Sequence, residues 1–340
     1  MVAISSKTRE ILRELCMNSR ITITELSEKL KISRSAVSKR IEALEQELGL
    51  RYTIEIDRGE LGLGMFIAYY LKFMKKPPDS FLKAFLDETD AVQLALKTTG
   101  DFDLVLFVLP EDYLNFAKWH IELGLKFAEY GASVNKSDMD IIHLGFIPLA
   151  NSTIQKSKLD DIYKRLLIEL NRDSRASIRE LSKRLKLNEE MVRYYLVKLT
   201  KSGIIRRFTA VITKPPESSS IMMFFKYTYR PGAVDRLIEK RKVYFKKEAE
   251  PPVYNDWQMV ASTSGASDEF EWAMAETPKQ AKEERLNLHN RIFARDSPDV
   301  KSALVTGVVK GLLSVRNVTI KDVFIKLPWQ PGRDYKGESP

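Results

Sequence analysis

An internal repeat constrains the fold of this chain more than any other feature of its sequence. Shifted by 155 residues, the segment 19–32 lies over the segment 174–187, and the match continues to Leu44 over Leu199. The matched polar residues include Arg20 and Arg175, Glu25 and Glu180, and Ser27 and Ser182. Two unrelated amphipathic helical pairs that agree by chance are the alternative, but they would not need to share polar residues. The repeat therefore indicates a duplicated structural unit.

Each copy begins with three predicted helices, because apolar residues recur there every three or four positions. The helices are expected at 8–16, 25–30 and 34–47 in the first copy, and at 159–171, 177–185 and 189–201 in the second. Thr24, Ser33 and Asn188 stand where their side chains can cap helix N-termini. Two helices joined by a short turn, with a third helix ahead of them, form the helix-turn-helix arrangement.

A β segment follows each helix-turn-helix. Residues 51–56 are expected as a strand in the first copy, and residues 204–212 in the second. We interpret these segments as the wings of winged helix-turn-helix domains. Basic residues on a wing can hold DNA phosphates, which positions a protein without reading the sequence. The predicted phosphate contacts are Arg51, Arg206 and Arg207.

The rest of each copy has a different pattern. In the first copy the predicted order is strand 65–74, helix 79–88, strands 92–97 and 104–109, helix 112–130 and strand 140–147. This βαββαβ order is the ferredoxin-like arrangement. The second copy follows it less closely, with strand 221–229, helix 233–242, strand 258–263, helix 267–291 and strand 303–309. The predicted fold class is α+β, with two winged helix-turn-helix domains alternating with two ferredoxin-like (βαββαβ) domains.

These assignments divide the chain into five segments. Winged helix-turn-helix domains are expected over residues 1–58 and 151–214, and ferredoxin-like effector-type domains over residues 59–150 and 215–327. Residues 328–340 contain Gly, Pro and charged residues without an apolar pattern, so we expect a disordered tail.

Composition argues against several classes of function. Cys16 is the only cysteine and there are three histidines, so neither a disulfide nor a Cys- or His-rich metal site is expected. No basic and then apolar leader is evident, and the longest apolar runs, such as 104–109, have the length of a strand. We therefore expect a cytoplasmic protein without a membrane partner. Since no Gly-rich phosphate loop, HExxH or GxSxG pattern appears, no cofactor and no metal are expected.

The positive charge is concentrated in one part of the chain. The net charge is +9 overall, but residues 156–208 contain 15 Lys and Arg against 7 Asp and Glu, a net charge of +8. Residues 59–155 contain 8 basic and 13 acidic residues, a net charge of −5. A solvated helix face could give a similar count. Combined with the helix-turn-helix pattern, however, the charge predicts double-stranded DNA as the partner, because phosphate neutralisation drives such binding.

The third helix of each copy is the candidate DNA-reading helix. Val37 and Ile41 face the predicted core, which leaves the opposite face exposed. The candidate DNA contacts are Arg34, Ser35, Ser38, Lys39 and Arg40 in the first copy, and Arg193, Tyr194 and Lys198 in the second. Arg can bind guanine bidentately, whereas Glu189 and Glu190 repel phosphate but can accept from cytosine. The two copies are thus predicted to prefer different bases, unless the second copy is only structural.

Several short motifs carry a family resemblance. They are residues 33–41 in the first copy and residues 160–163, 171–175, 178–182 and 199–205 in the second. Together they are similar to the DNA-binding domain of the Lrp/AsnC (feast/famine) transcription regulators. The resemblance implies a sequence-specific DNA-binding regulator. Because members of that family usually carry one copy, it also implies a homodimer or higher oligomer, or an internal pseudo-dimer within one chain.

The turn at residues 99–104 resembles the turn of the same family's effector domain, where amino acids or related small molecules bind at a dimer interface. The resemblance implies that Gly100, Asp101 and Asp103 bind an effector. A plain β-turn, in which Gly100 supplies a positive φ, is the alternative. We place the corresponding turn of the second copy at residues 254–258, which lack the glycine and the second aspartate.

An enzyme of the same fold is the alternative function. Siroheme decarboxylases resemble Lrp/AsnC proteins, often occur as paired or fused subunits, and depend on histidines and arginines around a tetrapyrrole. His120, His143 and His289 fall outside the segment between the central strands where that family places its active residues. We therefore predict a regulator without catalytic activity.

Overall fold

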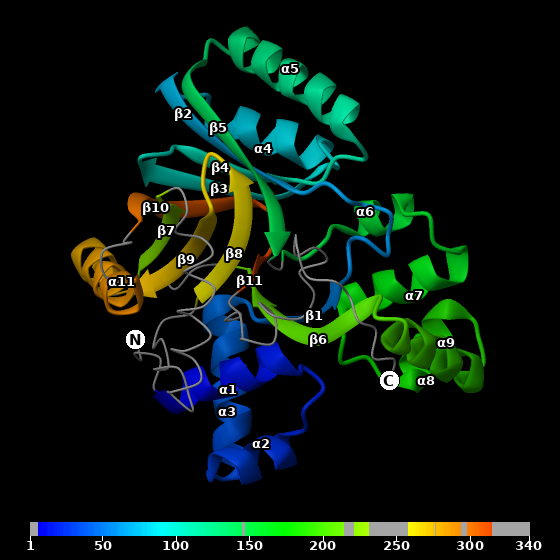
Figure 1. The fold of residues 1–340 in the computed structure, drawn as a ribbon. Helices are drawn as coiled ribbons and strands as arrows, with labels where there is room; N and C mark the ends of the chain where they lie inside the picture. Colours follow the sequence, from blue (N-terminus) through cyan, green and yellow to red (C-terminus); the bar gives the residue numbers. More distant parts are fainter. Residues whose placement is uncertain are drawn as a thin grey trace, which may run out of the picture.

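The computed structural model describes residues 6–144, 147–213, 221–230, 258–275, 277–293 and 298–314. Helix-turn-helix units and ferredoxin-like units alternate along the chain, which confirms the predicted α+β class (Figure 1). The predicted helix 233–242 and the predicted tail 328–340 lie outside the described residues.

The helices and strands follow the duplication. The first copy contains α1 (Ser6–Met17), α2 (Ile23–Leu30), α3 (Arg34–Leu48), β1 (Arg51–Ile56), β2 (Ile67–Lys75), α4 (Asp79–Glu88), β3 (Val92–Gly100), β4 (Leu104–Val108), α5 (Tyr113–Glu129) and β5 (Ser133–Leu144). The second copy contains α6 (Asn151–Lys156), α7 (Asp161–Arg172), α8 (Ile178–Leu185), α9 (Glu189–Lys201), β6 (Ile205–Ile212), β7 (Ile221–Thr228), β8 (Gln258–Gly265), β9 (Glu269–Ala275), α11 (Pro278–Phe293), β10 (Asp299–Lys310) and β11 (Leu313–Ser314).

The middle helix of each helix-turn-helix begins with a capping box. In α2, Glu25 N donates to Thr22 Oγ1 at 3.1 Å, and Thr22 N donates to the Glu25 carboxylate at 2.7 Å. Ser177 and Glu180 repeat this arrangement in α8. The prediction of Thr24 as the N-cap was therefore wrong. Thr22 takes that position because it has a glutamate three residues further on, which satisfies both backbone donors.

The turns into α3 and α9 also have the same geometry. Lys31 and Lys186 end the preceding helices in the left-handed conformation, with φ of 53° and 57°. Ser33 and Asn188 then cap the next helices as predicted, accepting from the N–H groups three residues on at 3.2 and 2.7 Å. The similar sequences of the two repeats thus give these turns the same local backbone geometry.

The two predicted wings are exchanged between the copies. β1 pairs antiparallel with β6, with Thr53 opposite Thr209, and β11 extends the same sheet. Thr53 Oγ1 donates to Asn171 Oδ1 on α7 at 2.7 Å, while Thr209 Oγ1 donates to the Cys16 carbonyl on α1 at 2.7 Å. Each strand therefore packs on the helices of the other copy. Both expected wing segments are strands, and each satisfies its backbone groups on the wing strand of the other copy.

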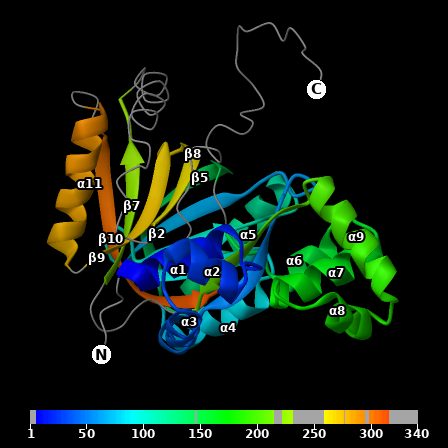
Figure 2. The ribbon, with the colours of Figure 1, turned by 90° about the horizontal axis from the view of Figure 1, so that it is seen from below.

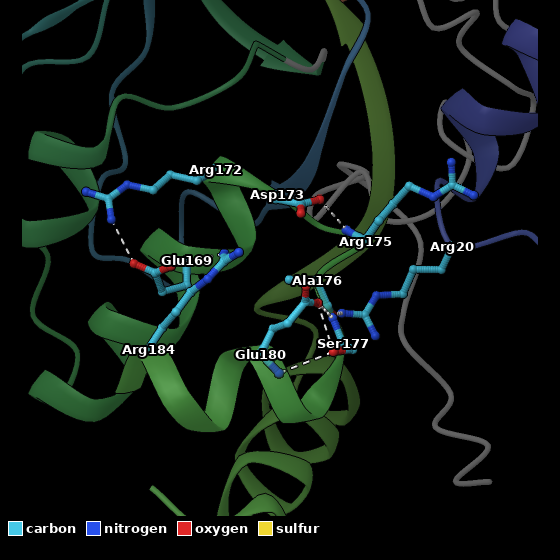
Figure 3. A network of polar contacts seen from close by, with 9 residues as sticks. All are labelled: Arg20, Glu169, Arg172, Asp173, Arg175, Ala176, Ser177, Glu180 and Arg184. Carbon is cyan, nitrogen blue, oxygen red and sulfur yellow. Dashed lines mark hydrogen bonds and ion pairs between the residues drawn. The ribbon is translucent and has the colours of Figure 1, made fainter. Parts of the chain in front are cut away.

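Identical polar residues of the repeat meet where the copies join. The Ser19 and Ser174 hydroxyl groups are hydrogen-bonded at 2.7 Å and are fully buried. Arg20 Nε donates to the Ser174 carbonyl at 2.7 Å. The Arg20 guanidinium also donates to the Ala176 carbonyl at 3.3 Å (Figure 3). Arg175 donates to the Ile21 carbonyl at 3.2 Å in the reverse direction. These reciprocal contacts relate the two copies by an internal pseudo-twofold axis. The two copies have the same polar residues here because the residues of each copy contact the equivalent segment of the other.

The two ferredoxin-like units close one β-barrel. The strand order is β10-β3-β4-β2-β5-β8-β9-β7, so β10·β3 and β5·β8 are the seams between the first and second copies. Helices α4 and α5 lie outside the first half of the barrel and α11 lies outside the second half (Figures 1 and 2). Because the barrel is closed, neither half exposes an unpaired sheet edge.

Aromatic side chains fill the barrel interior. Buried rings from both halves contact each other, with centroids 5.6 Å apart for Phe107 and Trp272 and 5.9 Å apart for Tyr70 and Phe224. Phe270 packs on both Phe107 and Phe224. Burying rings of this size makes a large contribution to the free energy of folding, and that contribution requires both halves.

The prediction of one long helix over residues 267–291 was wrong. Strand β9 occupies Glu269–Ala275, and α11 begins only at Pro278. Phe270 and Trp272 pack into the barrel, whereas Glu271 contacts Arg285 of α11 at 2.9 Å. Polar and apolar residues alternate here with the period of a strand, and that local signal should have been given more weight.

A buried cation breaks the symmetry of the barrel. Lys226 of β7 is 1% exposed, its ammonium lies 3.5 Å from the Asp140 carboxylate of β5, and it lies over the Tyr70 ring at 4.1 Å. Asp140 also accepts from Ser267 N at 2.6 Å. Burial lowers the pKa of Lys226, and the neighbouring Asp140 opposes that shift. Since Lys226 and Asp140 come from different copies, their ion pair crosses the junction.

We expect Asp140→Asn to lower the free energy of unfolding by up to about 3–5 kcal/mol, because it removes the nearer carboxylate of the buried Lys226 ammonium and leaves only Asp138, at 3.8 Å. Adding Lys226→Met in the same chain should restore most of that loss. Urea unfolding of the two single variants and the double variant measures this coupling. Independent, additive losses would show that the pair does not interact.

Candidate DNA-binding surface and effector turn

The reading face of α3 is exposed and basic. Arg34, Ser35 and Lys39 are exposed, while Val37 on the opposite side is fully buried. Within the described residues, neither Arg34 nor Lys39 forms an ion pair, so both cations are available to an anionic partner. The helix holds them rigidly because its inner face is part of the core.

The other predicted contacts of α3 are partly engaged within the helix. Ser38 Oγ donates to Glu42 at 3.4 Å, and Arg40 donates to the Ala36 carbonyl at 3.1 Å. Both residues are half-buried. The N-terminal half of α3 therefore presents Arg34, Ser35 and Lys39 most directly.

Helix α9 presents a different face at the same positions. Its residues Glu189, Glu190, Arg193 and Tyr194 are exposed. The Tyr194 side chain is 61% exposed and its ring packs edge-on against Tyr195 at 5.4 Å. Lys198 lies 5.4 Å from the centre of the Tyr163 ring, which holds its side chain along α9.

The predicted phosphate contacts on the strands differ in their surroundings. Arg51 is exposed on β1. Arg206 Nε donates to Asp57 at 2.8 Å, and Arg207 lies 3.6 Å from Glu55, so both are paired across β1 and β6. The sequence did not indicate these ion pairs, because the two strands are about 150 residues apart in the chain.

Helix α8 adds cations that we did not single out from the sequence. Arg179, Lys183 and Lys186 are exposed on or directly after this helix. In a helix-turn-helix the helix before the reading helix crosses the DNA backbone. The excess charge of +8 in residues 156–208 was the signal for these side chains.

The effector turn lies between the two halves of the barrel. Gly100 has φ of 139°, and a Cβ there would come within 2.6 Å of the Ser302 carbonyl on β10. The Asp101 carboxylate accepts from Ser302 N at 2.6 Å. The turn thus joins the first half to the last strand of the second, and glycine is required at its closest approach.

Asp103 is held by cations and a backbone amide of β2. It accepts from Phe73 N at 3.0 Å and lies 2.9 Å from Lys76 and 3.3 Å from Lys72. Burial by itself would raise the pKa of Asp103. The hydrogen bond from Phe73 and the two ammonium groups outweigh that effect and hold the pKa below its usual range.

The second copy has an equivalent turn at a place we did not predict. Gly265 has φ of 137°, and a Cβ there would come within 2.7 Å of the Met139 carbonyl on β5. Asp268 accepts from Tyr229 N at 2.8 Å, as Asp103 does from Phe73. Residues 254–257 of the turn that we assigned from the sequence lie outside the described residues, and Gln258 begins β8. Gly265 and Asp268 correspond to Gly100 and Asp103, whereas Ala266 replaces the first aspartate.

The structure describes the side chain of His120 but not those of His143 and His289. His120 Nδ1 is hydrogen-bonded to the Tyr69 hydroxyl at 2.9 Å on the outer face of the barrel. Among the described residues no cluster of His, Cys, Asp and Glu could hold a metal ion. No helix in the part of the chain that was described is long and apolar enough to cross a membrane.

Comparison with known proteins identifies the repeated module. A family model described as winged helix-turn-helix DNA-binding matches residues 4–47 and again residues 159–206. The proline dehydrogenase transcriptional activator of Rhodobacter capsulatus is 32% identical over 120 residues, which is 34% of this chain and 77% of that protein. An HTH-type transcriptional regulator of Mycobacterium tuberculosis is 30% identical over 135 residues, 39% of this chain and 86% of that protein.

A third relative is matched over a shorter region. An HTH-type transcriptional regulator of Pyrococcus horikoshii is 33% identical over 86 residues, 25% of this chain. The chain spans about half of that relative, 54% of its length. The repeated winged helix-turn-helix and these relatives define the class, proteins that carry a winged helix-turn-helix DNA-binding domain. The chain belongs to the Lrp/AsnC family.

A solved structure resembles this chain over almost its whole length. The crystal structure of the siroheme decarboxylase NirDL has a TM-score of 0.53 and 13% sequence identity, covering 92% of this chain and 94% of that one. The complex of NirDL with an iron-uroporphyrin III analogue gives a TM-score of 0.52 at 14% identity. At a sequence identity this low, the structural similarity shows that this chain and NirDL share a fold, and nothing about a shared activity.

Proposed function

We propose that this chain is a sequence-specific DNA-binding transcriptional regulator that supplies two recognition helices from one polypeptide. The exposed cations Arg34 and Lys39 on α3, in a helix-turn-helix that recurs in α8 and α9, are the observation that carries this proposal. Arg34 is suited to bidentate contact with guanine, and Lys39 to a base edge or a phosphate. The cations of α8 contribute contacts to the DNA backbone.

We also propose that a small molecule binds at the turns around Gly100 and Gly265. Its binding would affect the two seams of the barrel, β10·β3 and β5·β8. Each turn contacts the last strand of the opposite half, so a ligand bound there would act on the junction between the copies. The exposed Asp101 supplies a carboxylate for an ammonium group, and Lys72 and Lys76, which also hold the buried Asp103, lie beside it as cations for a carboxylate. An amino acid carries both groups.

A second candidate is a tetrapyrrole enzyme, and the fold likeness to NirDL over 92% of the chain favours it. Against it stand the aromatic side chains that fill the barrel and the engagement of His120 with Tyr69. The regulator therefore remains the better supported function.

We expect Arg34→Ala and Lys39→Ala each to weaken binding to a selected DNA site without changing the thermal unfolding of the protein. A lost base contact should cost about 1–3 kcal/mol, roughly 5- to 150-fold in affinity. Gel-shift titrations over a salt series measure this, with Lys83→Ala on α4 as the control. Unchanged affinity in both α3 variants would contradict the proposal.

For the effector, we expect at least one L-amino acid to raise the melting temperature of the protein at millimolar concentration. A ligand at 100 times its Kd stabilises the folded state by about 2.7 kcal/mol. Asp101→Ala should lose this response, whereas Asp87→Ala, which changes an exposed carboxylate on α4, should keep it. A response that is equal in both variants would place the ligand elsewhere.

The second candidate function, a tetrapyrrole enzyme, is tested by titrating the protein with siroheme. The regulator account predicts no saturable change in the Soret band at one equivalent and no release of carbon dioxide. A stoichiometric complex that turns over would establish the second candidate instead.

A further inference from the structure

The two recognition helices are tied together within one chain but are not equivalent. The Ser19–Ser174 hydrogen bond and the β1·β6 pairing join their domains across the pseudo-twofold axis. In a symmetric dimer both reading helices have the same sequence, and the preferred DNA site is a palindrome. Here each chain contributes one α3 and one α9, so their side chains decide whether the two half-sites are alike.

The repeat offset of 155 residues aligns the reading faces position by position. Lys39 of α3 corresponds to Tyr194 of α9, which replaces an ammonium by an aromatic ring. At two further positions of the same face, Ala36 corresponds to Met191, and Glu42 corresponds to Val197. The α9 face thus gains three large apolar side chains.

These apolar side chains are exposed. Met191, Tyr194 and Val197 are 38%, 61% and 46% exposed, although Val192 between them is fully buried. They recur every three residues and so lie along one side of α9. Tyr194 is oriented by its contact with Tyr195, which reduces the conformational entropy that it would lose on binding.

The surroundings of this apolar stripe indicate what it binds. Exposed cations accompany it on α9, at Arg193 and Lys198, and the preceding helix α8 and its C-cap carry two more, Lys183 and Lys186. An apolar surface with such a basic border fits a polyanion that presents methyl groups. The major groove of DNA offers this combination, because thymine carries a 5-methyl group and phosphates line the groove.

We propose that the preferred target is an asymmetric duplex site, in which α3 reads a guanine-containing half and α9 reads a thymine-containing half through Met191, Tyr194 and Val197. This inference rests on the proposed function. Glu189 and Glu190, at the start of α9, further disfavour the guanine edge that Arg34 accepts in α3, because carboxylates cannot donate to its two acceptors.

The test begins with in vitro selection of duplex sites by the full chain. The selected site should consist of two unlike halves, centred about 10 base pairs apart. Replacing thymine by deoxyuridine removes only the methyl group. In the α9 half this should weaken binding by about threefold to tenfold for each contacted methyl, and in the α3 half it should have no effect.

Variants assign the effect to α9. Tyr194→Ser should weaken binding to the thymine site and remove most of its sensitivity to deoxyuridine. Lys39→Ala is the matched control at the equivalent position of α3, and it should weaken binding to both DNAs by the same factor. Because both side chains are exposed, the two variants are expected to unfold at the temperature of the parent protein.

The outcomes separate the two proposals. Failure to select any DNA would overturn the proposed function itself. Selection of a palindrome, or of a site whose affinity does not respond to deoxyuridine in either half, would leave the regulator intact and overturn the asymmetric site. Equal deoxyuridine sensitivity in Tyr194→Ser and the parent protein would also overturn it.

Discussion

The exchange of strands between the two copies is the interaction on which the rest of this structure depends. β1 packs on α7 and β6 packs on α1, each through a buried threonine hydroxyl. The same exchange occurs in the barrel, where β10 completes the first half and β5 pairs with the second. A single copy by itself would expose strand edges and lack part of its core, so each copy depends on the other.

Duplication within one chain permits an asymmetry that a homodimer cannot have. Equivalent hydrogen bonds, Asp103 N to the Leu71 carbonyl and Asp268 N to the Tyr227 carbonyl, align Tyr70 with Lys226. If both positions were lysine, two ammonium groups would lie close together inside the barrel and repel each other. One lysine over one tyrosine ring, beside Asp140, is stable instead. The reading helices differ in the same way, since the equivalent position is Lys39 in the first copy and Tyr194 in the second.

Local features of the sequence predicted much of this fold. The helix periodicity, the caps Ser33 and Asn188 and the order of the elements in the first copy depend on residues close together in the chain. The partners of β1 and β6 could not be predicted in this way, because both strands had the same apolar pattern and either could have formed a separate wing. Arg206 and Arg207 were consequently assigned to phosphates, although carboxylates of β1 and the residue after it lie beside them.

The second ferredoxin-like unit shows a different limit. Its sequence has diverged enough that we mistook strand β9 for helix and did not recognise the turn at Gly265. The turn is recognisable only through Gly265, whose positive φ and close approach to β5 repeat those of Gly100. Glycine is required at this position because strand β5 lies close to it, and the residues next to it in the sequence do not reveal that contact. The candidate DNA contacts on α3 and α9 were accessible from the sequence, since helical periodicity alone decides which side chains face outward.

In the proposed function, one polypeptide carries both unlike recognition helices of a single DNA-binding unit. Native mass spectrometry of the full chain with a duplex that contains one selected site, combined with footprinting of that duplex, tests this arrangement. The account predicts that one chain on one duplex is a stable complex and protects both halves of the site. If protection of the two halves always requires a second chain, with each chain engaging only one helix-turn-helix, the account is contradicted.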